Sequence, residues 1–95
     1  MNLDFVEFEW DEYNESKIWN KHRVTADETE DCFFNTHVLK KKPSSSDRYY
    51  LYGKTNGGRY LFIVFQYKKD IKFIRPISAR NMTSGEFSVY GRSLK

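Results

Sequence analysis

The 95-residue chain has one cysteine, two prolines and no long hydrophobic run, and each scarcity excludes a class of protein. The single Cys32 excludes an intramolecular disulfide, so the cytoplasm is the expected compartment. The longest apolar run, YLFIVF at 60–65, has the length of a strand and not of a membrane span. The N-terminal MNLDFVEFEWDE is acidic, which argues against a signal peptide. The chain length predicts one domain, 1–95, with a modest core.

Side chains that bind metals or act as nucleophiles are also sparse. His22, Cys32 and His37 have nine and four residues between them, a spacing that fits no structural zinc site. No pair of carboxylates with a glycine forms a calcium loop. NGGR at 56–59 lacks the spacing and the lysine of a phosphate-binding loop, so we interpret it as a turn. The sequence therefore predicts no metal and no cofactor.

Aromatic side chains are abundant, and charge is distributed unevenly along the chain. There are eight Phe, seven Tyr and two Trp. Residues 1–35 carry ten acidic and three basic side chains, a net charge of −7, whereas residues 36–95 carry three acidic and thirteen basic, a net charge of +10. This asymmetry predicts one surface for an anionic partner and another for a basic one. The alternative is that the folded surface mixes the charges of the two halves, so that neither half forms a distinct charged surface.

The apolar periodicity predicts the order β-α-α-β-β-β-β-α, an α+β fold with an antiparallel sheet and helices mainly on one side. Asp11 is expected to cap the first helix. Thr25 with Glu28 and Thr83 with Glu86 have the spacing of capping boxes for the other two. The predicted strands cover 3–10, 36–42, 48–55, 59–68 and 71–79, and the predicted helices cover 12–22, the part of 23–34 that follows Thr25, and 84–90.

Three details of the sheet follow from residue type. Asn56 and Gly57 are expected to adopt the positive φ angles of a tight hairpin turn. Strand 59–68 is apolar at both alternating sets of positions, so we expect it to be central and covered on both faces. Pro76 cannot donate a ladder hydrogen bond, so the last strand is either at an edge or bulged there. A bulge would remove Arg75 from the core face and re-aim Arg80.

Basic residues interleaved with tyrosines make the sheet a candidate nucleic-acid surface. Arg48 and Arg59 open two strands, and Arg80 closes the last one. Guanidinium groups bind phosphate through paired hydrogen bonds, and tyrosine rings stack on bases. The alternative is that lysines solubilise the turns and tyrosines fill the core.

Arg80 stands where the last strand ends and a helix begins. Backbone N–H groups at 84–86 would favour an anion at that corner, and Glu86 and Tyr90 would share one helix face. An arginine, a carboxylate, a phenol and a histidine suffice for metal-free RNA cleavage, because the arginine stabilises the phosphorane while other groups transfer protons. The alternative is a surface ion pair between Arg80 and Glu86, which contributes little.

Three segments together resemble the BrnT family, small toxins of bacterial type II toxin–antitoxin systems. They are FEWDEYNESKIWNKHRV at 8–24, RYYLYGKTNGGRYLFIVF at 48–65 and IRPISARNMTSGEFSVY at 74–90. Arg23 stands where the family usually has Gly, and Pro76 where it often has an aliphatic residue. The family pattern falls here on Phe8, Trp10, Asp11, Lys17, Asn20, Lys21, His22, Val24, Arg48, Gly53, 77–80, Glu86 and Tyr90.

The resemblance implies a RelE-like fold, in which two N-terminal helices and a short C-terminal helix flank a curved antiparallel sheet. It implies a metal-independent endoribonuclease that leaves a 2′,3′-cyclic phosphate and inhibits translation and growth. Its implied partners are RNA and a BrnA-like antitoxin with a ribbon-helix-helix DNA-binding domain. Operator DNA would be contacted only through the antitoxin complex, and no membrane is involved.

The resemblance also implies the roles of single residues, and two other functions stay open. Trp10 and Asp11 are interpreted as structural, a core anchor and a helix cap. A non-catalytic module would bind nucleic acid on the same basic sheet, and a protein-interaction domain would use the acidic first third or the sheet. The implied catalytic residues are Arg80 and Arg48 for charge stabilisation and His22, Glu86 and Tyr90 for proton transfer, and the candidate RNA contacts are Lys21, Arg59 and Lys54.

Overall fold

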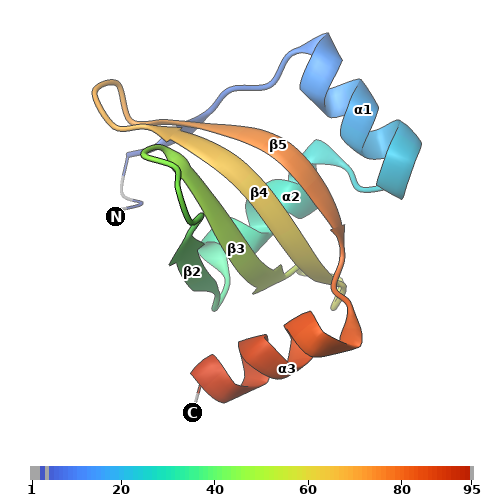
Figure 1. The fold of residues 1–95 in the computed structure, drawn as a ribbon. Coiled ribbons are helices and arrows are strands. Elements are labelled where there is room, and N and C mark those ends of the chain that lie inside the picture. The colour runs from blue at the N-terminus through green and yellow to red at the C-terminus, as the bar shows by residue number, and fades with distance from the viewer. Residues whose placement is uncertain (1–2, 4, 95) are drawn as a thin grey trace.

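A computed structural model describes residue 3 and residues 5–94, and its elements follow the predicted order (Figure 1). The first strand is shorter than the predicted 3–10, a range that includes Asp4, which lies outside the described residues. No helix in the described part of the chain is long and apolar enough to cross a membrane. The elements are β1 (Glu7–Phe8), α1 (Glu12–His22), α2 (Ala26–Phe34), β2 (Val38–Lys41), β3 (Arg48–Lys54), β4 (Tyr60–Lys68), β5 (Phe73–Asn81) and α3 (Ser84–Ser93).

The five strands form one curved sheet in the order β1-β5-β4-β3-β2 (Figure 1). The pairs β2–β3, β3–β4 and β4–β5 are antiparallel, and the two residues of β1 run parallel to β5. β4 is central, as its apolar sequence predicts. The fold is therefore the predicted α+β class with a mostly antiparallel sheet.

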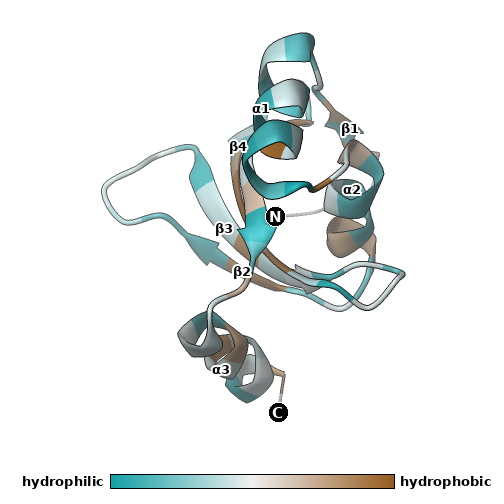
Figure 2. Cartoon of the chain, turned by 90° about the vertical axis from the view of Figure 1, so that its right-hand side faces the viewer, coloured by the Kyte–Doolittle hydropathy of each residue, from teal (hydrophilic) through white to brown (hydrophobic). Residues whose placement is uncertain are grey.

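Helices α1 and α2 cover one face of the sheet, while α3 lies at one end of the other (Figure 2). The Phe33 ring of α2 packs edge-on against Phe65 of β4, with centroids 5.0 Å apart. Along β4 only alternate residues are buried, so the prediction that both faces are covered is wrong. The second face of β4 keeps aromatic side chains because Tyr60 packs against α3 and Phe62 packs against tyrosines of β3. The buried core comprises Ile18, Val24, Cys32, Phe33, Leu51, Leu61, Ile63, Phe65, Ile74 and Ala79.

Gly53 permits α2 to approach β3 closely. A Cβ atom on Gly53 would lie 2.9 Å from Cβ and 3.0 Å from the carbonyl oxygen of Cys32. Real side chains do not tolerate such contacts with a backbone, so the position requires glycine for close packing.

The predicted bulge is present in β5. Phe65 pairs with Pro76 and Val64 pairs with Ser78, which leaves Ile77 as the extra residue. Without this residue, side chains five positions apart on one strand would point to opposite faces. The bulge places Arg75 and Arg80 on the same face. β5 also extends to Asn81, so Arg80 lies inside the strand, paired with Phe62, and does not follow it.

The caps form as predicted, and two local details differ. Asp11, Thr25 and Thr83 each cap a helix through a capping box. In the hairpin turn Gly58 and not Asn56-Gly57 has the positive φ, because the turn closes through a hydrogen bond from the Gly58 N–H to the Thr55 carbonyl. α3 continues three residues beyond Tyr90, the predicted end.

Arg23 adopts the left-handed conformation at the end of α1, with φ 52° and ψ 42°. Its N–H donates to the Trp19 carbonyl oxygen at 2.8 Å. α1 thus ends with a residue in the left-handed conformation, a position that glycine usually occupies, although here the residue is arginine.

Candidate active site

The sheet face that α1 and α2 leave uncovered is called here the open face. The bulge and the strand register arrange its side chains in rows that cross β3, β4 and β5. One row near α3 holds Tyr52, Phe62 and Arg80, and is called the Arg80 row. The open face comprises Arg48, Tyr50, Tyr52, Lys54, Tyr60, Phe62, Val64, Gln66, Arg75, Ser78 and Arg80.

Arg80 and Glu86 form a two-pronged ion pair that joins the sheet to α3. Arg80 Nη1 donates to Glu86 Oε1 at 2.7 Å, and Nη2 donates to Oε2 at 2.8 Å. The Thr83 N–H also donates to Glu86 Oε1, at 2.9 Å. The hydrogen bonds from Arg80 hold the pKa of Glu86 below its usual range, and the same bonds raise the pKa of Arg80. Glu86 is therefore a carboxylate at neutral pH.

The Arg80 guanidinium stays accessible although it is paired. Its side chain is 34% exposed, against 19% for Glu86. The guanidinium carbon lies 4.7 Å from the centroid of the Phe62 ring, so the aromatic face supports it from below. A planar guanidinium supported on one side and open on the other suits a phosphate group.

Tyr52 is a phenol in the Arg80 row that the sequence did not single out as a site residue. Its ring packs edge-on against Phe62, with centroids 5.2 Å apart. Burial raises the pKa of Tyr52 and the Glu86 carboxylate adds to the rise, whereas the Arg80 charge opposes it. The signal was present in the alternation of β3, which places Arg48, Tyr52 and Lys54 on one face.

Tyr90 is buried and attaches α3 to the rest of the molecule. Its hydroxyl donates to the carbonyl oxygen of Thr36 at 3.0 Å, and its ring packs against Tyr60. Burial raises the pKa of Tyr90. Its proton is committed to a main-chain acceptor in this conformation, which favours an anchoring role over the predicted proton transfer.

Arg59 joins the end of α1 to the end of β5. Its Nε donates to Asn81 Oδ1 at 2.7 Å, and Nη2 donates to the His22 carbonyl oxygen at 3.0 Å. Nη1 donates to the Arg23 carbonyl oxygen at 2.7 Å and pairs with Glu28 at 3.3 Å. All three nitrogens therefore bind protein acceptors, which favours a structural role over the predicted RNA contact. The same links bring half-buried His22 beside the residue that follows Arg80.

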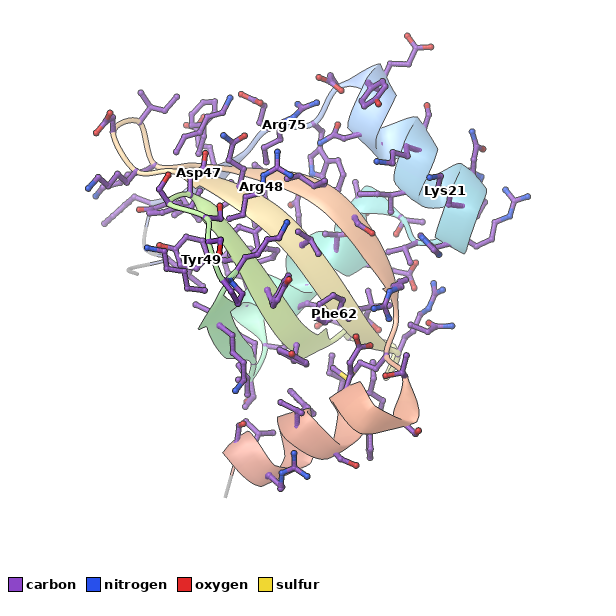
Figure 3. All side chains as sticks on the ribbon, in the orientation of Figure 1. Lys21, Asp47, Arg48, Tyr49, Phe62 and Arg75 are labelled. Atoms are coloured by element: carbon purple, nitrogen blue, oxygen red, sulfur yellow. The ribbon has the colours of Figure 1, made fainter. Side chains whose placement is uncertain are left out.

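The two predicted lysine contacts lie at different borders of the open face. Lys54 pairs with Tyr60 across the hairpin, and its ammonium lies 5.5 Å from the Tyr60 ring centroid. Lys21 is exposed on α1, which runs along the β5 side of the sheet (Figure 3). Lys54 is therefore close to the Arg80 row, and Lys21 flanks it.

Arg48 belongs to a second row with Gln66 and Arg75, called here the Arg48 row. Gln66 is four residues from Phe62, a separation of about 13 Å along β4. Figure 3 shows Arg48 and Arg75 together toward the loops and Phe62 closer to α3. Arg48 and Arg80 therefore share a face but not a row.

Arg75 is neutralised by two carboxylates of the segment between β1 and α1. Its Nη1 donates to Glu9 Oε1 at 3.1 Å and to Asp11 Oδ2 at 2.9 Å. The hydrogen bonds from Lys68 and, to a smaller extent, Arg75 hold the pKa of Glu9 low, and Arg75 holds the pKa of Asp11 low. Arg75 thus ties the cap of α1 to the sheet.

The described residues contain no group of three or more His, Cys, Asp or Glu placed to hold a metal ion. Burial raises the pKa of Cys32 to about 12, with the charges of Asp31 and Glu28 adding to the shift. A thiol of this kind is a small apolar core side chain and not a nucleophile.

Comparisons with known proteins agree with this architecture. Residues 10–86 match the family described as "Ribonuclease toxin, BrnT, of type II toxin-antitoxin system". The solved structure of the Brucella abortus ribonuclease toxin, BrnT, is similar at 24% sequence identity and a TM-score of 0.64, covering 83% of this chain and 99% of that chain. At this identity the structural likeness confirms the fold. A search of curated proteins gives no match.

Proposed function

Because the chain belongs to the BrnT family of ribonuclease toxins of type II toxin–antitoxin systems, we propose that RNA is cut on the open face at Arg80. The substrate of this protein is RNA, and its protein partner is an antitoxin. The observation that carries the proposal is the partly exposed Arg80–Glu86 pair, which the bulge and α3 bring together. It supplies a phosphate-binding cation and a carboxylate at one point.

In the proposed reaction the scissile phosphate binds the Arg80 guanidinium in place of, or beside, the Glu86 carboxylate. The 2′-oxygen attacks phosphorus and loses its proton, the bond to the 5′-oxygen breaks, and that oxygen gains a proton. The products are a 2′,3′-cyclic phosphate and a 5′-hydroxyl. Arg80 stabilises the negative charge that grows on the phosphorane, the largest single contribution in reactions of this type. No metal takes part in these steps.

Glu86 is the proposed proton acceptor. Arg80 keeps it ionised at neutral pH. When phosphate draws the guanidinium away, the pKa of Glu86 returns toward its usual value, and its affinity for the 2′-hydroxyl proton rises.

His22 is the proposed proton donor, and Tyr52 is the alternative donor within the Arg80 row. Arg59 keeps the end of α1, and with it His22, beside the end of β5. Tyr90 would take part only if α3 moved enough to release its hydroxyl from Thr36. Its first role in the proposal is therefore to hold α3, and so Glu86, against the sheet.

Basic residues around the Arg80 row are proposed to hold the rest of the RNA strand. Lys54 and Lys21 would bind phosphates on either side of the cleaved one. The Arg48 row lies about 13 Å from the Arg80 row along the strands, so Arg48 would bind a more distant phosphate and not the scissile one. Each phosphate contact adds salt-sensitive affinity.

The test is incubation of RNA with the purified protein in EDTA, beside folded Arg80→Ala and Arg75→Ala variants. Removing the main charge-stabilising group is expected to lower the cleavage rate about 10²–10³-fold. Arg75→Ala removes a cation from the same face and is expected to keep cleavage within about tenfold, because the Arg75 guanidinium is already paired with the carboxylates of Glu9 and Asp11. Products are checked for 2′,3′-cyclic phosphate ends.

Two outcomes would contradict the proposal. Wild-type cleavage rates in folded Arg80→Ala would remove Arg80 from the site. Intact RNA in every sample, together with binding that weakens smoothly as lysines are removed, would favour the non-catalytic binding module.

We also propose that the antitoxin carries a ribbon-helix-helix DNA-binding domain and that both proteins act in the cytoplasm. The resemblance to the family supports this proposal. In this arrangement the toxin contacts operator DNA only through the toxin–antitoxin complex. A gel-shift experiment with operator DNA compares the toxin alone with the toxin–antitoxin complex. A shift by the toxin alone would contradict the arrangement.

A further inference from the structure

A cavity of about 680 Å³ lies at the end of the sheet opposite α3, where the β2–β3 and β4–β5 connections meet. It is called here the lysine pocket, and its lining includes Lys41, Tyr49, Tyr67, Lys68, Lys69 and Ile71. We propose that the lysine pocket binds a nucleotide of the RNA substrate several positions away from the cleaved bond. This inference rests on the proposed function, because it takes Arg80 as the start of the RNA path.

The walls of the lysine pocket suit a base. The Tyr49 and Tyr67 rings meet edge-on with centroids 6.4 Å apart, and Tyr49 stacks on Phe65 at 5.6 Å. Both tyrosines are half-buried, so their rings are fixed by packing while part of each surface stays accessible. Base stacking on such rings is tolerant of sequence and loses little side-chain entropy. Exposed Ile71 extends the apolar wall.

The charges of the lysine pocket suit phosphates. Its lining carries three lysines against two aspartates, Asp47 and Asp70. Lys68 donates to both oxygens of Glu9, at 3.0 and 3.1 Å, so it is committed to the protein. Lys41 and Lys69 are exposed and form no ion pair with another described residue. These two ammonium groups are therefore the ones available to a backbone phosphate.

The lysine pocket lies around the loop end of the sheet from Arg80, because Tyr49 and Tyr67 belong to the covered face, next to Phe65, whereas Arg80 belongs to the open face. Asp47 of the pocket accepts a hydrogen bond from Gln66 of the Arg48 row at 2.7 Å. Lys68 is six residues from Phe62 along β4, a distance of about 20 Å. A strand leaving Arg80 would therefore pass Arg48 on the open face and then bend around the loop end of the sheet to reach the tyrosines. A stacked strand advances about 3.4 Å per nucleotide, so the part of this path along β4 takes about six nucleotides, and the bend around the end of the sheet adds to that number.

The test measures binding of 2′-O-methyl RNA, which cannot be cleaved, in lengths of two, four, six and eight nucleotides by fluorescence anisotropy. The wild type is expected to gain at least about tenfold in affinity between two and eight nucleotides. The double variant Lys41→Ala/Lys69→Ala is expected to lose this gain and to bind the two-nucleotide RNA as the wild type does. Its salt slope with the eight-nucleotide RNA falls by about 1.4, the value for two phosphate contacts on a single strand.

A matched control removes the same charge elsewhere. Lys17→Ala/Arg92→Ala changes α1 and α3 and is expected to change eight-nucleotide binding less than about twofold. Equal losses in both double variants, or an affinity that does not depend on RNA length, would overturn the inference.

Adenosine monophosphate serves as the probe for a free nucleotide. If it binds the wild type and not Lys41→Ala/Lys69→Ala while eight-nucleotide binding is the same in both, the pocket is a mononucleotide site and the inference fails. Because 2′-O-methyl RNA is not cut, this outcome is independent of cleavage. If binding of 2′-O-methyl RNA depends on the lysine pocket but natural RNA is not cleaved, the proposed function is refuted and the inference about the pocket stands.

Discussion

The two faces of the sheet are made by the same strands, but they carry opposite kinds of side chain. On the covered face, β4 places Leu61, Ile63 and Phe65 beneath α1 and α2, where all three are fully buried. On the open face, the same strand places Phe62 beneath the Arg80 guanidinium. The period of two in a strand allows one segment to build a core and a binding surface at once.

Within the open face, the partners of a charged side chain and not its residue type decide its role. Arg75 and Arg80 both form ion pairs on the open face. Arg75 is paired with carboxylates next to the start of α1, so it stabilises a junction. Arg80 is paired with a carboxylate of α3 and remains a third exposed, so it is available to a ligand. Changes on the covered face should therefore alter stability, and changes near Arg80 should alter cleavage.

The largest expected effect is on the covered face. Phe33→Ala removes a ring that contacts Phe8 and Phe65, and it should lower the free energy of unfolding by about 3–5 kcal/mol. Urea denaturation followed by circular dichroism measures the loss. The neighbouring Phe34 is 66% exposed, so Phe34→Ala should cost less than about 1 kcal/mol. Equal losses for the two variants would contradict the assignment of the core.

The next effect is on the open face. Tyr52→Phe removes only a hydroxyl from the Arg80 row, and it should slow RNA cleavage about 10–100-fold if that phenol donates a proton. The unfolding midpoint should stay near that of the wild type. Tyr50→Phe removes a hydroxyl from the adjacent row and should leave the rate within about twofold. An unchanged rate in Tyr52→Phe would leave His22 as the proposed donor.

Local features of the fold were predictable because their causes lie within a few residues. Asp11, Thr25 and Thr83 cap helices through contacts three positions ahead, so spacing alone reveals them. The bulge followed from Pro76, which lacks an N–H, and from the misplaced charge of Arg75. The hairpin was predicted correctly, but its positive φ lies at Gly58 and not at Asn56 or Gly57. Three adjacent residues of the turn are of types that adopt this conformation, so the sequence does not decide which of them does.

The site was predictable only in part because its contacts join distant segments. Arg80, Glu86 and Thr83 lie within seven residues, and their cluster forms as the sequence suggested. Arg59 instead binds atoms of α1 and α2 that are more than thirty residues away, which no local pattern reveals. Tyr52 could have been found by combining the alternation of β3 with the hairpin register.

A smaller effect concerns the ion pair at the border of the two regions. Glu86→Gln should lower the free energy of unfolding by about 1 kcal/mol at neutral pH, reduced by the exposure of Arg80. The folded state lowers the pKa of Glu86, so this stability is present above the unfolded value near 4.5 and is lost as the pH falls through the lower folded pKa. The difference between wild type and variant should therefore shrink from pH 7 to pH 3. A difference that grows toward low pH would contradict the pairing.

The smallest expected effect is a gain in stability at the end of α1. Arg23 has a left-handed backbone, which costs a side-chain-bearing residue about 1–2 kcal/mol. Glycine removes this cost, but it adds unfolded-state entropy and loses the contact of the Arg23 guanidinium with the Trp19 ring at 5.2 Å. Arg23→Gly should therefore raise the free energy of unfolding by about 0.5 kcal/mol. Arg23→Ala is the matched control, because it loses the same ring contact and keeps the backbone cost. If both variants are less stable than the wild type by the same amount, the ring contact and not the backbone conformation governs this position.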